Sequence, residues 1–505
     1  MNARKILSSV FFNYLGAISV SLIGFVATPI VLGHLGKQGY GGWALIASII
    51  GYSSLLDLGV GLTVMRMVAE RAHLSDRDEL RDIVSTGLLI YGAAGLLLLA
   101  VGASLAGEFA QAFHIAGPLR HQFVIAFIVM IGVAGLTFPA GLYTGINQGF
   151  GHFRQQNMIV IAQALGGTGT TIAIAIAGGG LIPLSLGWAV CVVLGFAAKI
   201  VYAARAFGIV PDPRRFEPGR ARALMGVSAW MFIINLANKV IWNTDTVVVG
   251  AVLGAIAVAH YAVALGPATA VRTVTDQFNS VTYSAAASLR AQDELAALRR
   301  LLLEATRVVT SFIGPFVVLF ALWGAQFLRL WVGPSLMSSA ATLVVLVIGM
   351  LSSSVQATAT QILLAFELQR RMAVVAVAEA AANLICSVLL ARTMGIEGVA
   401  LGTTIPTTVT AFGYYLPKAA RLLSIPLAGV LRRLVGPAAL CAGAFLLFRF
   451  GVPALAFPSL PVFLVFAGLF IVVLVVAGVL LDREERGTYL GLVRAYRRQD
   501  ARVRA

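Results

Sequence analysis

The segment Trp230–Leu253, WMFIINLANKVIWNTDTVVVGAVL, is the most informative part of this chain about its fold. It is long and apolar enough to cross a bilayer, which takes about 20 residues as a helix. At about 100° per residue, its polar and aromatic side chains share an arc of roughly 120°, namely Asn235, Asn238, Lys239, Trp242, Asp245 and Thr246. A membrane helix turns such a stripe toward other helices or a watery cavity, because an ionised group in lipid costs several kcal/mol. The stripe therefore predicts a cavity lining; alternatively, Lys239 and Asp245 neutralise distant partners and hold the bundle together.

The composition of the whole chain agrees with a membrane protein. It is 59% hydrophobic and 11% charged over 505 residues, whereas soluble proteins carry about 25% charged residues. Windows of about 20 apolar residues predict fourteen spans. They cover residues 9–32, 39–64, 83–106, 122–146, 158–178, 183–204, 224–252, 256–283, 301–322, 340–366, 372–392, 396–417, 435–451 and 460–481.

The distribution of positive charge indicates topology. The net charge of +16 suits a nucleic-acid partner by itself, but most Lys and Arg gather in alternate loops, which excludes that interpretation. The basic loops are 66–82, 205–222 and 418–434. Five cations fall on the other side (Lys37, Arg120, Arg329, Arg392, Arg449) and three inside spans (Lys239, Arg272, Arg307). The positive-inside rule then places both termini in the cytoplasm.

The chain contains an internal repeat. At an offset of 218, Leu35-Gly36 aligns with Leu253-Gly254, and Trp43-Ala44 aligns with Tyr261-Ala262. The repeat covers six helices, an even number, so both copies enter the membrane in the same direction, and parallel repeats place a substrate site where the halves meet. The predicted fold is all-α, with two parallel six-helix lobes and two C-terminal helices. Its parts are residues 1–205, a basic linker 206–223, residues 224–417, two helices within 418–481, and a basic tail 482–505.

Several charged residues within or near the spans are candidates for a site. Arg272 and Asp276 are four apart and share a helix face, as a binding pair or as a packing pair. Arg307 binds substrate or snorkels to the interface, and Arg66 closes its span at the interface or at a cavity mouth. Asp57 lies deep enough to need a partner or a proton. In the first repeat, the residues that match the polar stripe are small and leave room: Ala17, Val20, Ser21, Gly24, Ala27 and Thr28.

Signals of catalysis or of a resident cofactor are weak. The six histidines are scattered and form no Ser/His/Asp group. The glycine runs at 166–169 and 178–180 lack the lysine and the strand–loop–helix setting of a nucleotide loop. Cys191, Cys386 and Cys441 lie in apolar spans without metal-ligand spacing. We expect no enzyme, cofactor or metal site, and transport driven by an ion or substrate gradient or by the membrane potential. The basic tail predicts contact with anionic membrane lipids.

Three segments resemble one family. LGKQGYGGWALIASIIGYSSLLDLGVG (Leu35–Gly61), NTDTVVVGAVLGAIAVAHYA (Asn243–Ala262) and LRLWVGPSLMSSA (Leu328–Ala340) resemble bacterial polysaccharide-transport flippases, the Wzx-type O-antigen or oligosaccharide flippases. Their superfamily, the multidrug/oligosaccharidyl-lipid/polysaccharide exporters, includes drug/cation antiporters and peptidoglycan lipid flippases.

The resemblance implies a substrate and a mechanism. Such flippases carry a polyprenyl-diphosphate-linked oligosaccharide across the bacterial inner membrane by alternating access, for lipopolysaccharide O-antigen or exopolysaccharide. Their cavities are cationic, which implies that Lys239 and Arg272 engage the diphosphate, with Arg307 and Arg66 as further cations. This chain departs from that pattern because its first repeat has almost no deep cation.

The combined prediction assigns two kinds of site residue. Asn235, Asn238 and Trp242 join the cations as substrate-binding residues, and Asp57, Asp245 or Asp276 couple transport to protons or sodium. One alternative is an antiporter for organic cations, with the carboxylates as ligands. The other is a multi-span glycosyltransferase or polymerase, which would carry a large outside loop; the outside loops predicted here are short.

Overall fold

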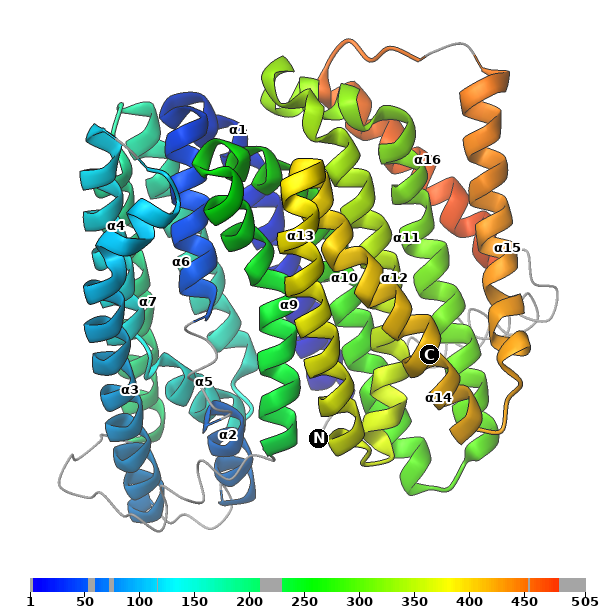
Figure 1. Ribbon diagram of the computed structural model, residues 1–505. Helices are drawn as coiled ribbons and strands as arrows, with labels where there is room; N and C mark the ends of the chain where they lie inside the picture. The colour runs from blue at the N-terminus through cyan, green and yellow to red at the C-terminus, as the bar shows by residue number, and fades with distance from the viewer. Residues whose placement is uncertain are drawn as a thin grey trace, which may run out of the picture. The chain divides into compact units, whose positions relative to one another are not determined.

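The computed structural model describes residues 3–52, 60–71, 77–115, 117–208, 229–452 and 455–480, and within them it contains helices and no strand (Figure 1). Ten helical segments of this part are long and apolar enough to cross a membrane. Each of the fourteen predicted spans contains helix. The predicted all-α polytopic fold is therefore confirmed.

The helices carry the following bounds. They are α1 (Ala3–Gly51), α2 (Val60–Arg71), α3 (Arg77–Ala112), α4 (Pro118–Leu136), α5 (Ala140–Gly149), α6 (Phe153–Ile176), α7 (Leu181–Phe207), α9 (Ala229–Leu253), α10 (Ala255–Ala291), α11 (Leu295–Val332), α12 (Ala340–Ala365), α13 (Gln369–Thr410), α14 (Leu416–Leu422), α15 (Leu427–Leu446) and α16 (Leu460–Leu480). Short 3₁₀ and π segments occupy Pro334–Ser339, Ala411–Tyr415 and Leu447–Gly451.

Two features differ from the predicted spans. The fourth span is divided between α4 and α5 at Pro139, because proline lacks a backbone N–H and its ring clashes with the preceding turn. Helices α10 and α11 extend beyond their predicted spans toward the loop that joins them. Exposed charged residues such as Arg290 and Arg300 lie on these extensions, where the helix satisfies its backbone without needing an apolar surface.

The internal repeat is also visible in the backbone, where three short turns in one half match three short turns in the other. Gly36 and Gly254 both have positive φ, 69° and 85°, as do two further pairs at nearly the same offset: Gly117 with Gly333, and Gly178 with Gly395. Glycine adopts this conformation without a Cβ clash. Gly117 and Gly333 each precede a proline at the start of a helix. The equivalent turns indicate that the two halves share one backbone plan.

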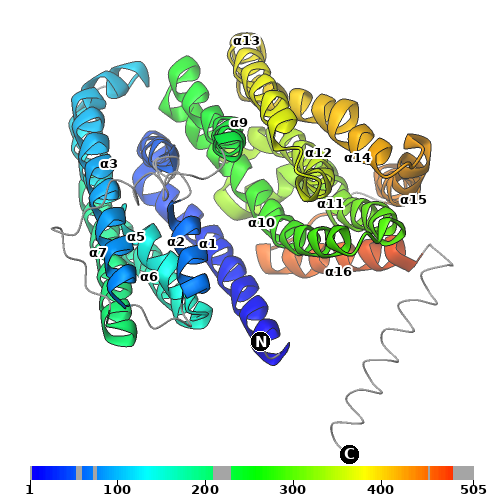
Figure 2. The same ribbon diagram turned by 90° about the horizontal axis from the view of Figure 1, so that it is seen from below.

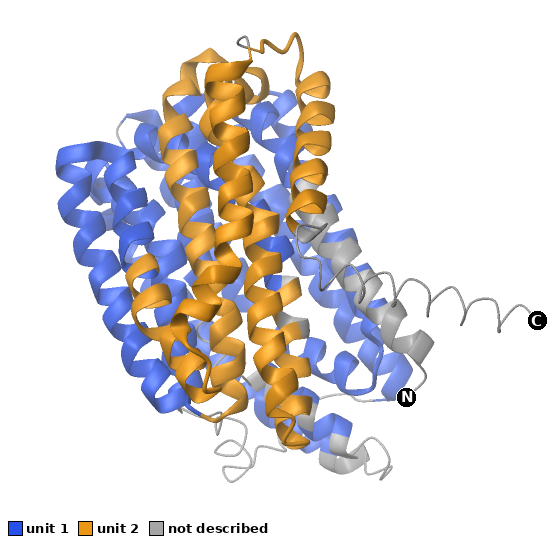
Figure 3. Ribbon diagram, turned by 90° about the vertical axis from the view of Figure 1, so that its right-hand side faces the viewer, with its two compact units in different colours: residues 1–277, 368–407 blue, residues 278–367, 408–505 orange. Residues whose placement is uncertain are grey.

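The described helices form two compact units, residues 1–277 with 368–407, and residues 278–367 with 408–505 (Figure 3). The predicted lobe limits remain a prediction, because most of the linker 206–223 and the whole tail 482–505 lie outside the described residues. Within the first unit, α1 packs against α6 and α9, and α3 against α4; Figure 2 gives this unit in a second view. In the second unit, α11 packs against α12, α15 and α16.

One close approach in the first unit depends on glycine. A Cβ atom added at Gly41 in α1 would clash with the carbonyl oxygen of Ala255, at the start of α10. Small residues permit such close helix contacts in membranes. This contact brings the second half of α1 against the first turn of α10, beside the pocket described next.

Candidate functional site

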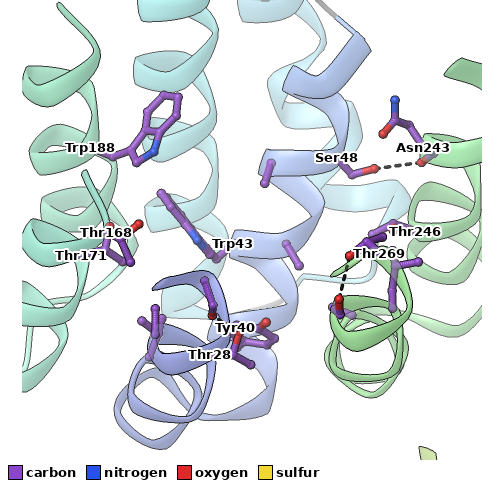
Figure 4. Close-up of a pocket in the computed structure, with 18 of the residues that line it drawn as sticks. Thr28, Tyr40, Trp43, Ser48, Thr168, Thr171, Trp188, Asn243, Thr246 and Thr269 are labelled. Atoms are coloured by element: carbon purple, nitrogen blue, oxygen red, sulfur yellow. Dashed lines mark hydrogen bonds between the residues drawn. The ribbon is translucent and has the colours of Figure 1, made fainter. Parts of the chain in front are cut away.

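A pocket of about 400 Å³ lies within the first unit, among α1, α6, α7, α9 and α10 (Figure 4). Four aromatic side chains line it: Tyr40, Trp43, Trp188 and Trp242. Seven further lining residues carry a hydroxyl or an amide: Thr28, Ser48, Thr168, Thr171, Asn243, Thr246 and Thr269. None of the described residues that line the pocket is Asp, Glu, Lys, Arg or His. It is therefore an uncharged pocket with both flat apolar faces and hydrogen-bonding groups.

The turn at Gly36 places both arms of α1 around this pocket. Thr28 lies before the turn, and Tyr40 and Trp43 lie after it. Gly24 and Ala27 also line the pocket, and neither has a bulky side chain. These two residues and Thr28 belong to the small residues of the first repeat that match the polar stripe of α9, and all three line the pocket.

The hydroxyl groups leave acceptors available toward the pocket. Thr28, Thr171 and Thr269 each donate to a carbonyl of their own helix at 2.8–2.9 Å, and Ser48 donates to the Asn243 carbonyl at 2.9 Å. A hydroxyl that has donated its hydrogen retains lone pairs as acceptors. The side-chain Nδ2 of Asn243 is buried and has no hydrogen-bond partner among the described residues. The hydroxyls of the lining thus offer acceptors, whereas the Asn243 Nδ2 atom is enclosed by protein.

A cationic group adjoins the pocket at Trp242. The Arg272 Cζ atom lies 3.8 Å from the Trp242 ring centroid, and its Nε atom lies 3.3 Å from the Asp276 carboxylate. Lys239, on α9, is close enough for like-charge repulsion with Arg272. Lys239 pairs with no carboxylate among the described residues. Two cations and one carboxylate leave one net positive charge beside the pocket.

The pocket and the cations lie at different depths along α9. Counted back from the turn at Gly254, Thr246 lies about two helical turns away, Trp242 about three and Lys239 about four. On α10, Arg272 lies about five helical turns beyond the same glycine. Trp242 therefore stands between the uncharged pocket and the cations.

Asp245 belongs to a separate, sealed network in the same unit. Its side chain is buried at 4% exposure, and its Oδ2 accepts hydrogen bonds from the Tyr261 hydroxyl at 2.7 Å and the Thr403 hydroxyl at 2.6 Å. Thr403 also accepts from the Asn383 amide at 2.7 Å. The network joins α9, α10 and both halves of α13.

Two oxygens of this network lack donors. Asp245 Oδ1 and Asn383 Oδ1 are buried and have no hydrogen-bond partner among the described residues. Buried polar atoms in native proteins are nearly always satisfied, so these two oxygens, on side chains that share Thr403 as a partner, could accept a proton or a small cation. Ser387, one turn from Asn383, supplies a further oxygen near the carboxylate.

The other predicted site residues have different placements. Asp57 lies outside the described residues, as does the side chain of Arg66 on α2. Asn235 and Asn238 are exposed on α9 and do not line the pocket. Arg307 is buried in α11 of the second unit and donates to the Gly478 carbonyl of α16 at 2.9 Å. That contact favours a packing role, and substrate binding by Arg307 remains a prediction.

Part of the site has no signal in the polar pattern of the sequence. Trp43 was noted only for its alignment with Tyr261, and Trp188 was not noted at all, because neither stands in a polar stripe. Lys199 falls within the predicted span 183–204 but is not among the predicted site residues; it is buried in α7 and donates to the Thr144 hydroxyl at 3.3 Å. The scarcity of tryptophan, six residues in the chain, was the one available signal for the aromatic lining.

Solved structures show the same fold at low sequence identity. An inward-facing multidrug resistance MATE family transporter of the MOP superfamily aligns with a TM-score of 0.67 at 13% identity, over 81% of this chain and 94% of that chain. The lipid II flippase MurJ, in an inward closed conformation, aligns with a TM-score of 0.68 at 12% identity, over 94% of this chain and 98% of that chain. No curated protein matches the sequence.

The family model described as "Polysaccharide biosynthesis protein" matches residues 6–288. The match covers most of the first repeat, all of α9 and α10 up to residue 288, and so includes Lys239, Trp242 and Arg272. Since it spans more than half of the sequence, the chain belongs to the polysaccharide biosynthesis protein family.

Proposed function

We propose that this protein is a flippase that moves a polyprenyl-diphosphate-linked oligosaccharide across the bacterial inner membrane by alternating access. Its product would serve surface polysaccharide, such as lipopolysaccharide O-antigen or exopolysaccharide. The observation that carries the proposal is the placement of Lys239 and Arg272 at Trp242, beside an uncharged polar and aromatic pocket. A diphosphate–sugar head cannot cross lipid unaided, and it needs cations as well as neutral hydrogen-bonding groups.

In this proposal Lys239 and Arg272 hold the diphosphate. Arg272 provides a guanidinium that forms paired hydrogen bonds with phosphate oxygens, and Lys239 provides a point charge. Asp276 competes with the substrate for Arg272, and its side chain is half exposed. Binding of the diphosphate therefore exchanges one ion pair for another instead of requiring a bare buried cation.

Asp245 is the carboxylate that we assign to ion coupling. Asp276 is engaged by Arg272, and Asp57 lies outside the described residues. The sealed network of Asp245, Asn383, Thr403 and Ser387 supplies oxygen atoms, which suit a hard cation such as sodium. A proton on the carboxylate would satisfy Asp245 Oδ1 alone.

The function is tested by flipping in proteoliposomes that contain a fluorescent polyprenyl-diphosphate oligosaccharide, with and without proton and sodium gradients. We expect protein-dependent movement that is lost in Lys239→Ala and in Arg272→Ala. Full movement in both variants would remove these residues from the site, and no movement by the wild-type protein would refute the proposed function.

An antiporter for organic cations is the second candidate, because the fold also matches a multidrug resistance transporter and Asp245 is a buried carboxylate. Uptake of an organic cation by the same vesicles, abolished by Asp245→Asn and unaffected by Lys239→Ala, would favour it. Sugar transfer by the purified protein would instead indicate an enzyme.

A further inference from the structure

The uncharged pocket has the chemistry of a carbohydrate site. A sugar ring presents apolar C–H faces and a rim of hydroxyl groups, so it needs flat apolar surfaces and neutral hydrogen-bonding partners together. Three tryptophans and one tyrosine provide the flat surfaces. The hydroxyls of Thr28, Thr171 and Thr269 provide acceptors. The volume of about 400 Å³ lies within the range of small-molecule sites.

The composition of the lining favours a neutral sugar over two other ligand classes. The described lining has no carboxylate, so an organic cation would have only the aromatic faces to replace its hydration, and the hydroxyl side chains would add no counter-charge. Asp245, which precedes the lining residue Thr246, turns away into its own network with Tyr261 and Thr403. A lipid chain gains nothing from seven hydroxyl and amide side chains, which would lose water without gaining partners.

The position of the pocket matches the covalent order of the proposed substrate. In the substrate, the diphosphate lies between the lipid and the first sugar. In the protein, Trp242 lies between the cations and the pocket, because its ring stacks on Arg272 and also lines the pocket. Lys239 lies about one helical turn farther from the Gly254 turn than Trp242 does, and Thr246 lies about one turn nearer to it. A diphosphate at the cations therefore directs its sugar into the pocket.

We infer that this pocket is a subsite for the neutral sugar residues attached directly to the diphosphate, with Trp43 and Trp188 as the residues that recognise the sugar. The inference rests on the proposed function, because the cations place the diphosphate. Since no charged side chain of the described residues lines the pocket, an acidic sugar at this position finds no counter-ion and loses its hydration. The subsite is selective for uncharged sugars.

The test measures binding to the purified full-length protein for three probes. These are polyprenyl diphosphate alone, the same lipid with a neutral disaccharide, and the same lipid with a uronic-acid disaccharide. We expect the neutral sugar to tighten binding and the uronic-acid disaccharide to add no affinity. Trp43→Ala and Trp188→Ala should each weaken binding of the neutral-sugar probe about tenfold, while binding of bare polyprenyl diphosphate stays unchanged. Trp188→Phe, which retains an aromatic face, should recover part of the loss.

Trp230→Ala is the matched control, because Trp230 lies on α9, is 38% exposed and does not line the pocket. It should behave as the wild type with all three probes. A neutral sugar that adds no affinity in the wild-type protein overturns the subsite but leaves the diphosphate site, and with it the proposed function, intact. Equal losses for bare and sugar-bearing lipid in the tryptophan variants also overturn the subsite. Failure of every probe to bind overturns the proposed function itself.

Discussion

Two replacements of Asp245 distinguish a role of this residue in cation binding from a role in the stability of the helix bundle. In Asp245→Asn, the remaining oxygen can still accept from the hydroxyls of Tyr261 and Thr403, so the protein should fold. In Asp245→Ala, both hydroxyls lose their acceptor. At about 1–3 kcal/mol for each unsatisfied buried group, this loss amounts to about 2–6 kcal/mol of unfolding free energy. The isosteric variant is therefore the informative one.

The assay is thermal unfolding of the purified protein in sodium, with potassium and choline at the same ionic strength as controls. A cation that binds the native state stabilises it by about 2.7 kcal/mol at 100 times its Kd, and we expect this sodium effect in the wild-type protein. Asp245→Asn should unfold near the wild-type temperature in choline and show no sodium effect, because a neutral amide attracts a cation far less than a carboxylate does. The wild-type effect should also weaken at low pH, since a protonated carboxylate no longer attracts a cation. A full sodium response in Asp245→Asn would refute the assignment.

Three further predictions concern contacts in the two units. Arg272→Lys keeps the positive charge but loses the planar guanidinium stacked on a tryptophan, which lysine does not replace. The flipping rate should therefore fall between those of the wild type and Arg272→Ala. A wild-type flipping rate would show that charge alone suffices. Gly41→Ala forces a Cβ into a backbone carbonyl of α10 and should destabilise the protein by about 1–3 kcal/mol. Gly92→Ala, with nothing within 4 Å, should not, and equal melting temperatures would contradict the packing argument. Arg307→Met removes a buried hydrogen bond to α16. This variant should have a lower melting temperature, while the protein that remains folded should still flip substrate. Loss of flipping at an unchanged melting temperature would instead assign Arg307 to substrate binding.

The part of the fold that could be predicted from sequence is the part governed by local physics. Lipid leaves no water for the backbone, so a span must be a helix, and its length and hydropathy can be read directly from the sequence. The repeat was also legible, because Gly36 and Gly254 mark equivalent turns that need positive φ. The interruption at Pro139 was missed, although the proline itself was the signal.

Composition, hydropathy and helical periodicity are enough to predict the membrane class, the spans, the repeat and the stripe of polar residues on α9. The division of that stripe depends on tertiary packing, because residues of one helical arc contact different neighbours. Trp242 and Thr246 face the pocket with Trp43 and Trp188, whereas Asp245 turns to Thr403, 158 residues away. The periodicity of a helix reports which side chains share a face, but the choice among partners on that face belongs to helices far away in the chain, and packing alone brings them together.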